Sequence, residues 1–415
     1  MIAPDAPGLP ARKAALRLLD AVLRRGETLE QAGAAASRGL KGEDRALALA
    51  IAAEALRWLT DLDALIDSAT QQALPHDAKP RSVLRLMLAQ TLRLGTPPHA
   101  VIATALPLLS GGPRRLAHGV FSALLRRKAQ LPAQPTLPPA VAARWEQAHP
   151  DRTAAIAAAL AQLPPLDLSL RDSSETAQWC ERLGGTTLAP GHVRLLRGTA
   201  IESLPGFAEG AWWVQDLAAS LPARLLGEGG GRRALDLCAA PGGKTLQLAA
   251  AGWQVTALDK SARRLERLEA NLARAGLSAR IVTADALEWE PEERFDAILL
   301  DAPCSASGTC RRHPDVLHRI AAPQIADMAE LQTALLARAS CWLAPGGRLV
   351  YAVCSLEPEE GEAQVAAVGL TRDPIHPAEL PAGLLPSPDG TLRTDPGMLA
   401  EAGGMDGFFI ARWAS

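Results

Sequence analysis

Cysteine is scarce in this sequence. Six of the 415 residues are cysteines, too few for a disulfide scaffold in a chain of this length. No two of them are spaced as CxxC, so nothing indicates a zinc site, and we expect no metal. A cysteine with a function in this protein therefore acts as a free thiol.

Long apolar runs are also missing. The best candidate, residues 100–109, is shorter than the ~18 residues of a membrane helix and contains Pro107. Asp5 and several prolines lie where a secretory signal needs an apolar core. The composition, 48% hydrophobic and 21% charged, is that of a soluble globular protein. We expect a cytoplasmic protein without a membrane span, long enough for about two to four folded units.

The basic residues are unevenly distributed. The formal net charge of −2 alone argues against a nucleic-acid partner, yet residues 78–145 contain no acidic residue. We interpret this stretch as the binding surface for a polyanion, with the alternative that some arginines cap helices or pair with distant acids. Its cationic residues include Lys79, Arg81, Arg85, Arg93, Arg114, Arg115, Arg126, Arg127, Lys128 and Arg144.

Hydrophobic periodicity divides the chain into three parts. Residues 1–130 predict an all-helical domain, because apolar residues recur at helical spacing in ARKAALRLLDAVLRRG and in EDRALALAIAAEALRWLTDLDALID. Residues 131–230 combine a proline-rich linker, LPAQPTLPPA, with short alternating runs that predict a small α+β unit. In residues 231–415, short apolar strands alternate with helices, the pattern of a doubly wound α/β sheet.

A glycine-containing turn follows the first of these strands, in ALDLCAAPGGKT. Such a turn at a helix N-terminus brings a ligand close to backbone amides. A phosphate loop would need glycine where the chain has Cys238, and the dinucleotide pattern GxGxxG is absent. The turn therefore favours a nucleoside without a pyrophosphate.

Carboxylates follow the next two strands. Asp259 ends VTALD, where a carboxylate contacts ribose hydroxyls, and Asp285 ends ARIVTAD, where it can address an adenine edge. Either one alone could be a helix cap. Together with the glycine turn they favour S-adenosylmethionine as the cofactor.

Two cysteines follow the later strands, Cys304 in ILLDAPCSASGTC and Cys354 in GRLVYAVCSLEPEE. A lone cysteine is more often a core residue, but a pair at strand ends indicates thiol chemistry. Carbon 5 of cytosine is a poor nucleophile, and addition of a thiolate to carbon 6 activates it for methylation. Asp301 is the nearest candidate to protonate ring nitrogen 3. Methylation of an amino group would instead call for an Asn/Asp-Pro-Pro-aromatic loop.

The motifs ALDLCAAPGGKT, DAPCSASGTCRRHPD, VCSLEPEE and DGFFIAR resemble those of the RNA cytosine-C(5) methyltransferases of the Sun (RsmB) family. RSVLRLMLAQTLRL and PPHAVIATAL resemble the NusB-like RNA-binding domain of members that modify 16S ribosomal RNA. The resemblance implies a multidomain protein: an all-α NusB-like domain, a small α+β unit and a Rossmann-like S-adenosylmethionine-dependent methyltransferase domain. It implies ribosomal RNA as partner, and we expect a monomer.

The resemblance also implies residue roles that spacing alone leaves open. Cys354 would be the nucleophile, and Cys304 would assist release of the product. Lys244 would reach the substrate base or a backbone carbonyl, unless it only caps its helix. Val353 replaces a usual threonine, and DVLHRI replaces an aromatic-containing run after HPD. The implied cofactor-binding residues are Cys238, Ala239, Ala240, Pro241, Gly242, Gly243, Lys244, Asp259, Asp285 and Asp301.

Two other functional classes compete with this interpretation. A non-catalytic RNA-binding or assembly factor would keep the fold for its surface, but it would not need the two cysteines. A protein-arginine or small-molecule methyltransferase would not need the basic helical domain.

Overall fold

The computed structural model describes residues 7–196 and 200–415. The chain divides into two compact units. The first runs to Gln162 and also includes Cys310–Ile320, and the second consists of Leu163–Thr309 and Ala321–Ser415. Within these described ranges, no helix has both the length and the apolar character needed to cross a membrane.

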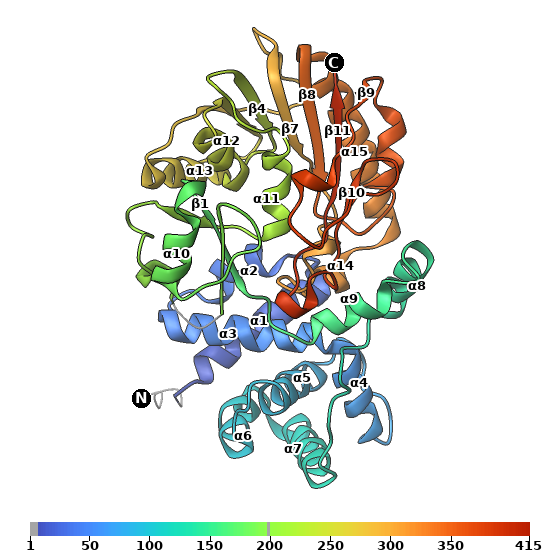
Figure 1. The fold of residues 1–415 in the computed structure, drawn as a ribbon. Helices are drawn as coiled ribbons and strands as arrows, with labels where there is room; N and C mark the ends of the chain where they lie inside the picture. Colours follow the sequence, from blue (N-terminus) through green and yellow to red (C-terminus); the bar gives the residue numbers. More distant parts are fainter. Residues whose placement is uncertain (1–6, 197–199) are drawn as a thin grey trace. The chain divides into compact units, whose positions relative to one another are not determined.

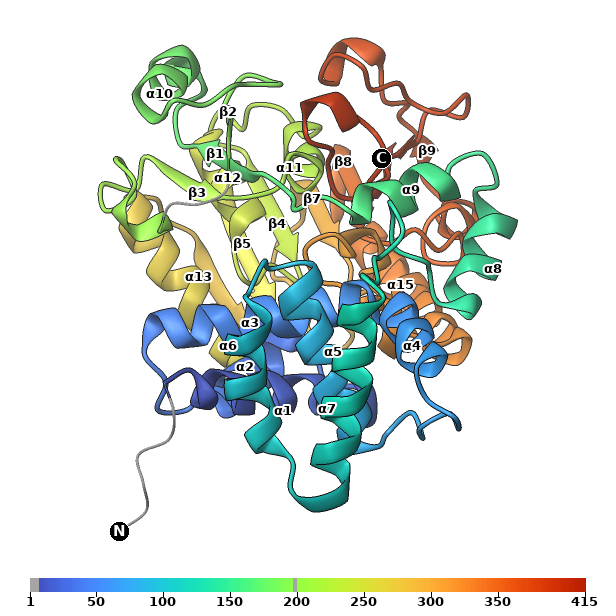
Figure 2. The same cartoon turned by 90° about the horizontal axis from the view of Figure 1, so that it is seen from below.

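The first unit is helical (Figures 1 and 2). Its amphipathic helices bury Leu, Ile, Val and Ala side chains in one core, in which α1 packs on α3 and α5 packs on α4, α6 and α7. The helices are α1 (Leu9–Arg25), α2 (Leu29–Ala36), α3 (Gly42–Arg57), α4 (Leu59–Ser68), α5 (Lys79–Leu92), α6 (Pro98–Ala105), α7 (Gly111–Arg126), α8 (Pro139–Ala148), α9 (Thr153–Leu160) and α14 (Val316–Arg319).

The proline-rich stretch 131–140 is fixed to the helical unit. The backbone N–H and the hydroxyl of Thr136 donate to the Asp61 carboxylate at 2.9 and 2.6 Å. Farther along, Arg57 Nη1 donates to the Leu160 carbonyl at 3.2 Å. These bonds give the physical reason why residues 131–162, which we predicted to lie beyond a domain boundary, cluster with the helices.

The segment Cys310–Ile320 follows the DAPC motif and belongs to the helical unit. Arg57 Nη2 donates to the Arg311 carbonyl at 2.9 Å, and His318 Nε2 lies 2.7 Å from the Leu56 carbonyl. Val316 and Leu317 are buried. The unusual run DVLHRI therefore packs among helices.

The second unit begins with a small antiparallel sheet of order β2-β1-β3. Its alternating apolar residues, such as Leu168, Val193 and Trp212, are buried together with Trp179 of α10. This arrangement agrees with the α+β unit predicted from the alternating runs. The elements are β1 (Leu166–Leu170), α10 (Thr176–Leu183), β2 (His192–Leu195), β3 (Trp212–Val214) and the following α11 (Leu217–Arg224).

A larger sheet of order β10-β11-β8-β7-β4-β5-β6 forms the rest of the second unit, with β9 paired to β11. Strands β4 to β8 are parallel, and β11 joins β8 antiparallel. The strands are β4 (Arg233–Leu237), β5 (Gln254–Asp259), β6 (Arg280–Thr283), β7 (Phe295–Asp301), β8 (Leu343–Val353), β9 (Thr371–Arg372), β10 (Leu392–Arg393) and β11 (Phe409–Ala414).

Helices cover both faces of this sheet (Figure 1). Along β7, Ala297 and Leu299 join the core beneath α11 and α12, while Ile298 and Leu300 join the core beneath α15. Burial on both faces explains why β7 reads as a continuous apolar run. The remaining helices of the unit are α12 (Gly243–Ala250), α13 (Ala262–Ala275) and α15 (Ala322–Cys341).

Strand order reverses between β4 and β7, because the chain runs outward through β5 and β6 and then returns to the other side of β4. In open α/β sheets, ligands bind at the carboxyl ends of strands beside such a reversal. The residues that follow β4, β7 and β8 are therefore expected to form the site.

Candidate active site

The loop after β4 adopts an unusual backbone conformation. Cys238 has φ 60° and Gly242 has φ 105°, in the region that residues other than glycine rarely occupy. A Cβ atom at Gly242 would lie 2.7 Å from Leu268 Cγ of α13, so glycine is also needed for close packing. The loop is fixed by the Ala239 N–H, which donates to the Leu258 carbonyl at 3.0 Å.

Asp259 fixes the same loop from the end of β5, where its side chain is buried. One carboxylate oxygen accepts from the Ala240 N–H at 3.2 Å, and the other accepts from the Ser261 N–H at 2.9 Å. Arg264 Nη1 lies 3.6 Å from the carboxylate. A carboxylate can accept about four hydrogen bonds, so these contacts leave capacity for the hydroxyls of a ligand.

Replacing Asp259 by alanine is expected to weaken S-adenosylmethionine binding about tenfold or more. A hydrogen bond to a charged group contributes roughly 1.5–3 kcal/mol, and the glycine loop would lose one of its anchors. Isothermal calorimetry measures the dissociation constant, with Asp327→Ala, at an exposed position of α15, as the control. Unchanged affinity in a folded Asp259 variant would remove this residue from the cofactor site.

Asp285 lies just beyond β6, next to the backbone of Asp259, whose carbonyl accepts from the Ala284 N–H at 3.2 Å. Its carboxylate accepts from the Leu287 N–H at 2.9 Å and so caps the local turn. Leu287 is 39% exposed. An apolar surface beside a carboxylate is suitable for an adenine ring and its edge.

Lys244 and Asp301 form an ion pair between α12 and the end of β7. Lys244 Nζ lies 2.6 Å from Asp301 Oδ2 and 5.4 Å from the centroid of the Phe408 ring. Burial alone would lower the pKa of Lys244, but the negative charges of Asp301, Cys354 and Asp236 outweigh it and raise that pKa. The ammonium group therefore stays charged.

The two strand-end thiols lie in contact. Cys304 Sγ is 3.5 Å from Cys354 Sγ, and the Gly308 N–H of the first loop donates to the Cys354 carbonyl at 3.0 Å. The hydrogen bond with Cys354, followed by burial, raises the pKa of Cys304 well above its ordinary value. Cys304 is therefore held as a neutral thiol beside Cys354.

Cys238 is not part of this pair and lies in the loop after β4. Burial, with the nearby charges of Asp259 and Asp301, raises the pKa of Cys238 to about 12. A thiol with this pKa is not a nucleophile near neutral pH. Cys238 thus shapes the glycine loop rather than supplying thiolate.

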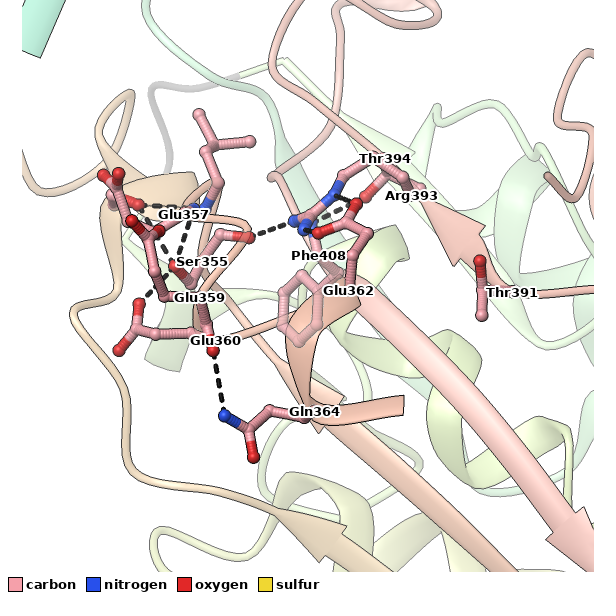
Figure 3. A network of polar contacts seen from close by, with 12 residues as sticks. Ser355, Glu357, Glu359, Glu360, Glu362, Gln364, Thr391, Arg393, Thr394 and Phe408 are labelled. Atoms are coloured by element: carbon pink, nitrogen blue, oxygen red, sulfur yellow. Dashed lines mark hydrogen bonds and ion pairs between the residues drawn. The ribbon is translucent and has the colours of Figure 1, made fainter. Parts of the chain in front are cut away.

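Our sequence analysis missed a buried polar network behind the thiols, part of which is drawn in Figure 3. Glu360 accepts hydrogen bonds from Ser305, Ser355 and Gln332. The motif VCSLEPEE contains Ser355 and Glu360, but the sequence alone does not show which of its glutamates is buried.

A buried acid, Asp236 of β4, also escaped notice. Its Oδ2 accepts from the Thr245 hydroxyl at 2.6 Å. Burial raises the pKa of Asp236 to about 7. The sequence contained one signal that could have identified Asp236, which is its position inside an otherwise apolar strand. A buried acid at such a position needs hydrogen-bond partners.

The acid-free stretch does not face solvent throughout. Arg85 binds Asp63 with two hydrogen bonds of 2.7 Å, and Arg81 pairs with Asp63 and Asp67. Both arginines are buried, so our interpretation of the stretch as a polyanion surface is wrong for them. Arg93 pairs with Glu54 and stacks on a tryptophan. The exposed cations of the stretch are Lys79, Arg93, Arg114, Arg115, Arg126, Arg127 and Lys128.

The sheet, the glycine loop and the strand-end carboxylates define a Rossmann-like S-adenosylmethionine-dependent methyltransferase, here carrying a NusB-like helical domain. Residues 224–414 match the family model described as 16S rRNA methyltransferase RsmB/F, and residues 9–129 match the NusB family. The chain belongs to the family of ribosomal RNA small subunit methyltransferase B, and it is therefore an rRNA methyltransferase.

Relatives support this membership along the whole chain. The chain is 36% identical over 432 residues to ribosomal RNA small subunit methyltransferase B of Klebsiella pneumoniae subsp. pneumoniae, with 97% of each chain covered. It is 34% identical over 433 residues to the protein of that name from Shigella flexneri, again with 97% of each covered.

Solved structures share the fold. A methyltransferase homolog protein from Pyrococcus horikoshii has a TM-score of 0.56 and 28% identity, covering 66% of this chain and 93% of that one. NSun6 from Pyrococcus horikoshii, solved with SFG, has a TM-score of 0.59 and 19% identity, covering 67% and 98%.

The residues present fit S-adenosylmethionine. A Cβ atom added at Gly243, the first residue of α12, would lie 3.5 Å from the nearest atom of Gln215. Asp259 lies at the end of β5, and Asp285 lies just beyond the adjacent strand β6. The cofactor would lie between the glycine loop and these two carboxylates, where it supplies an electrophilic methyl group. Among the residues that the structure describes, no group of three or more His, Cys, Asp or Glu side chains is arranged to hold a metal ion.

Proposed function

We propose that this enzyme methylates carbon 5 of a cytidine in 16S ribosomal RNA, in the cytoplasm, through a covalent cysteine–cytosine intermediate. The observation that carries the proposal is the contact between Cys304 and Cys354, whose sulfur atoms lie 3.5 Å apart. Methylation of an amino group needs no thiol, whereas methylation of carbon 5 needs one to activate the ring.

Each residue of the site then has a role. Cys354 Sγ adds to carbon 6 and makes carbon 5 nucleophilic. Asp301, in its protonated form, donates its proton to ring nitrogen 3, which favours this addition, and the Lys244 ammonium group stabilises the carboxylate that results. After methylation, a base takes the carbon 5 proton and the Cys354 thiolate is expelled. Cys304 assists this elimination, either as that base in its thiolate form or by donating a proton to the departing sulfur. The glycine loop, Asp259 and Asp285 hold the cofactor.

The reaction is tested by incubating the protein with isotopically labelled S-adenosylmethionine and unmodified 16S ribosomal RNA. Digestion to nucleosides should place the label in 5-methylcytidine. Label in N4-methylcytidine or in any other nucleoside would overturn the proposal. The same assay with a naked RNA and with a partly assembled small subunit identifies the preferred substrate.

The exposed basic residues of α7 and its C-terminal end are the proposed RNA contacts of the helical unit. Replacing Arg114 and Arg115 by alanine is expected to weaken RNA binding and to reduce its salt dependence. Each phosphate contact contributes roughly 0.7–0.9 to the slope of log affinity against log salt. Loss of two contacts should therefore reduce the slope by about 1.5.

The control is the double variant Arg17→Ala and Arg38→Ala, whose arginines are exposed on the same unit outside the acid-free stretch. Filter binding across a range of salt concentrations measures both slopes. Equal slopes for the two double variants would mean that α7 does not contact the RNA backbone.

A further inference from the structure

We propose that Glu360 is a positioning residue that sets the spacing of the two catalytic thiols, an inference that rests on the function proposed above. Ser305 directly follows Cys304, and Ser355 directly follows Cys354. The side chain of Glu360 binds both serines. One buried carboxylate therefore joins the two loops that present the thiols.

The contacts of this carboxylate come from three segments. Oε1 accepts from the Ser305 N–H at 2.7 Å and from Gln332 Nε2 of α15 at 3.3 Å. Oε2 accepts from the hydroxyls of Ser305 and Ser355. The same Gln332 amide donates to the Pro303 carbonyl at 2.8 Å, within the DAPC motif. All these side chains are buried.

The backbone of Glu360 is held as well. Its carbonyl accepts from the Tyr351 hydroxyl of β8 at 2.6 Å. Ser355 Oγ accepts from the Glu357 N–H at 3.0 Å, which closes the turn drawn in Figure 3. The side chain cannot shift without breaking bonds to α15 and to both cysteine loops.

The donors around Glu360 favour a carboxylate over an amide. Two hydroxyls, a backbone N–H and a side-chain amide all point at its oxygen atoms, and an ionised carboxyl group only accepts. Burial raises the pKa of Glu360, and the hydrogen bonds from Ser305, Ser355 and Gln332 act in the opposite direction, because a charged acceptor forms stronger hydrogen bonds than a neutral one. Glutamine would place an N–H₂ group against one of these donors and would force at least one hydroxyl to reorient.

Thiol spacing matters because Cys354 must reach carbon 6 while Cys304 reaches the same base during release. Misplacement of a reacting group by about 1 Å costs on the order of 10²-fold in rate. A loosened network would therefore slow thiol addition while leaving RNA contacts and the cofactor loop in place.

The test measures thiol addition directly. In a Cys304→Ser background, in which the covalent RNA adduct accumulates, adding Glu360→Gln should slow adduct formation about 10–100-fold on a denaturing gel. The matched control is Glu359→Gln, the same substitution at the exposed neighbouring glutamate, which should leave the rate unchanged. With both cysteines present, Glu360→Gln should lower kcat while KM for RNA stays within about twofold.

The outcomes separate the two proposals. If Cys304→Ser alone forms no adduct, the proposed function fails. If the adduct forms and Glu360→Gln slows it no more than Glu359→Gln does, only the positioning role is overturned. Calorimetric binding of S-adenosylmethionine verifies folding. Should Glu360→Gln not fold, Ser355→Ala removes one donor and should slow addition about 3–10-fold, and an unchanged rate would overturn the inference.

Discussion

Serine in place of Cys304 is expected to trap the enzyme on its product as a covalent protein–RNA complex. Addition by Cys354 and methylation would proceed, but elimination would lose the group that assists it. A denaturing gel after incubation with substrate RNA and S-adenosylmethionine should show a slowly migrating band. The hydrogen bond with Cys354 and burial raise the pKa of Cys304, so this thiol stays neutral while it lies beside the Cys354 thiolate.

Serine in place of Cys354 should abolish methylation and give no such band, because the hydroxyl of serine is far less nucleophilic than a thiolate. Cys341→Ser, at an exposed cysteine of α15, is the control and should behave as the unmodified enzyme. A band in the Cys354 variant alone would reverse the two roles, as expected if this chain followed DNA cytosine methyltransferases, whose nucleophile lies in the Pro-Cys motif.

Methionine in place of Lys244 is expected to lower kcat on the order of 10²-fold. The substitution keeps most of the side-chain volume but removes the buried charge 2.6 Å from Asp301, and loss of one preorganised electrostatic contact typically has this effect. Asp301 would lose the cation that orients it toward ring nitrogen 3. Steady-state kinetics with saturating RNA and cofactor measure the effect.

The same variant decides between the two interpretations of Lys244. If Lys244 only caps α12, its replacement should lower the stability of the protein, measured as a lower Tm, and leave the kcat of the folded enzyme unchanged. Lys41→Met, at an exposed lysine before α3, is the control for loss of a positive charge. Unchanged kcat in a folded Lys244 variant would remove this lysine from catalysis.

Local sequence predicted the parallel strands well, because each is a short apolar run bounded by turn residues. It did not predict that the last four residues of DGFFIAR begin β11, which pairs antiparallel with β8 from Phe409 to Ala414. An isolated apolar run near the end of a chain carries no information about its partner strand. The pairing depends on contacts between residues far apart in the sequence.

Charge patterning was informative only in part. Arg81 and Arg114 lie in the same acid-free stretch, yet Arg81 is buried against Asp63 and Asp67 while Arg114 is exposed. The acids come from α4, which precedes the stretch. Packing of α4 on α5, rather than composition, separated the arginines that are buried in ion pairs from those that are exposed at the surface.

The sequence by itself determined the class of this protein. The class is defined by short local motifs, namely the glycine turn, the strand-end carboxylates and the cysteine motifs. The chemistry of the ligand and of the reaction requires these residue types at these positions. Tertiary structure alone decided how these pieces meet. Strand order placed Cys304 and Cys354 in contact, and a helix from another part of the chain, α15, supplied Gln332 to the network of Glu360. Hydrogen bonds of a buried carboxylate depend on which segments surround it, and a linear pattern does not encode that neighbourhood.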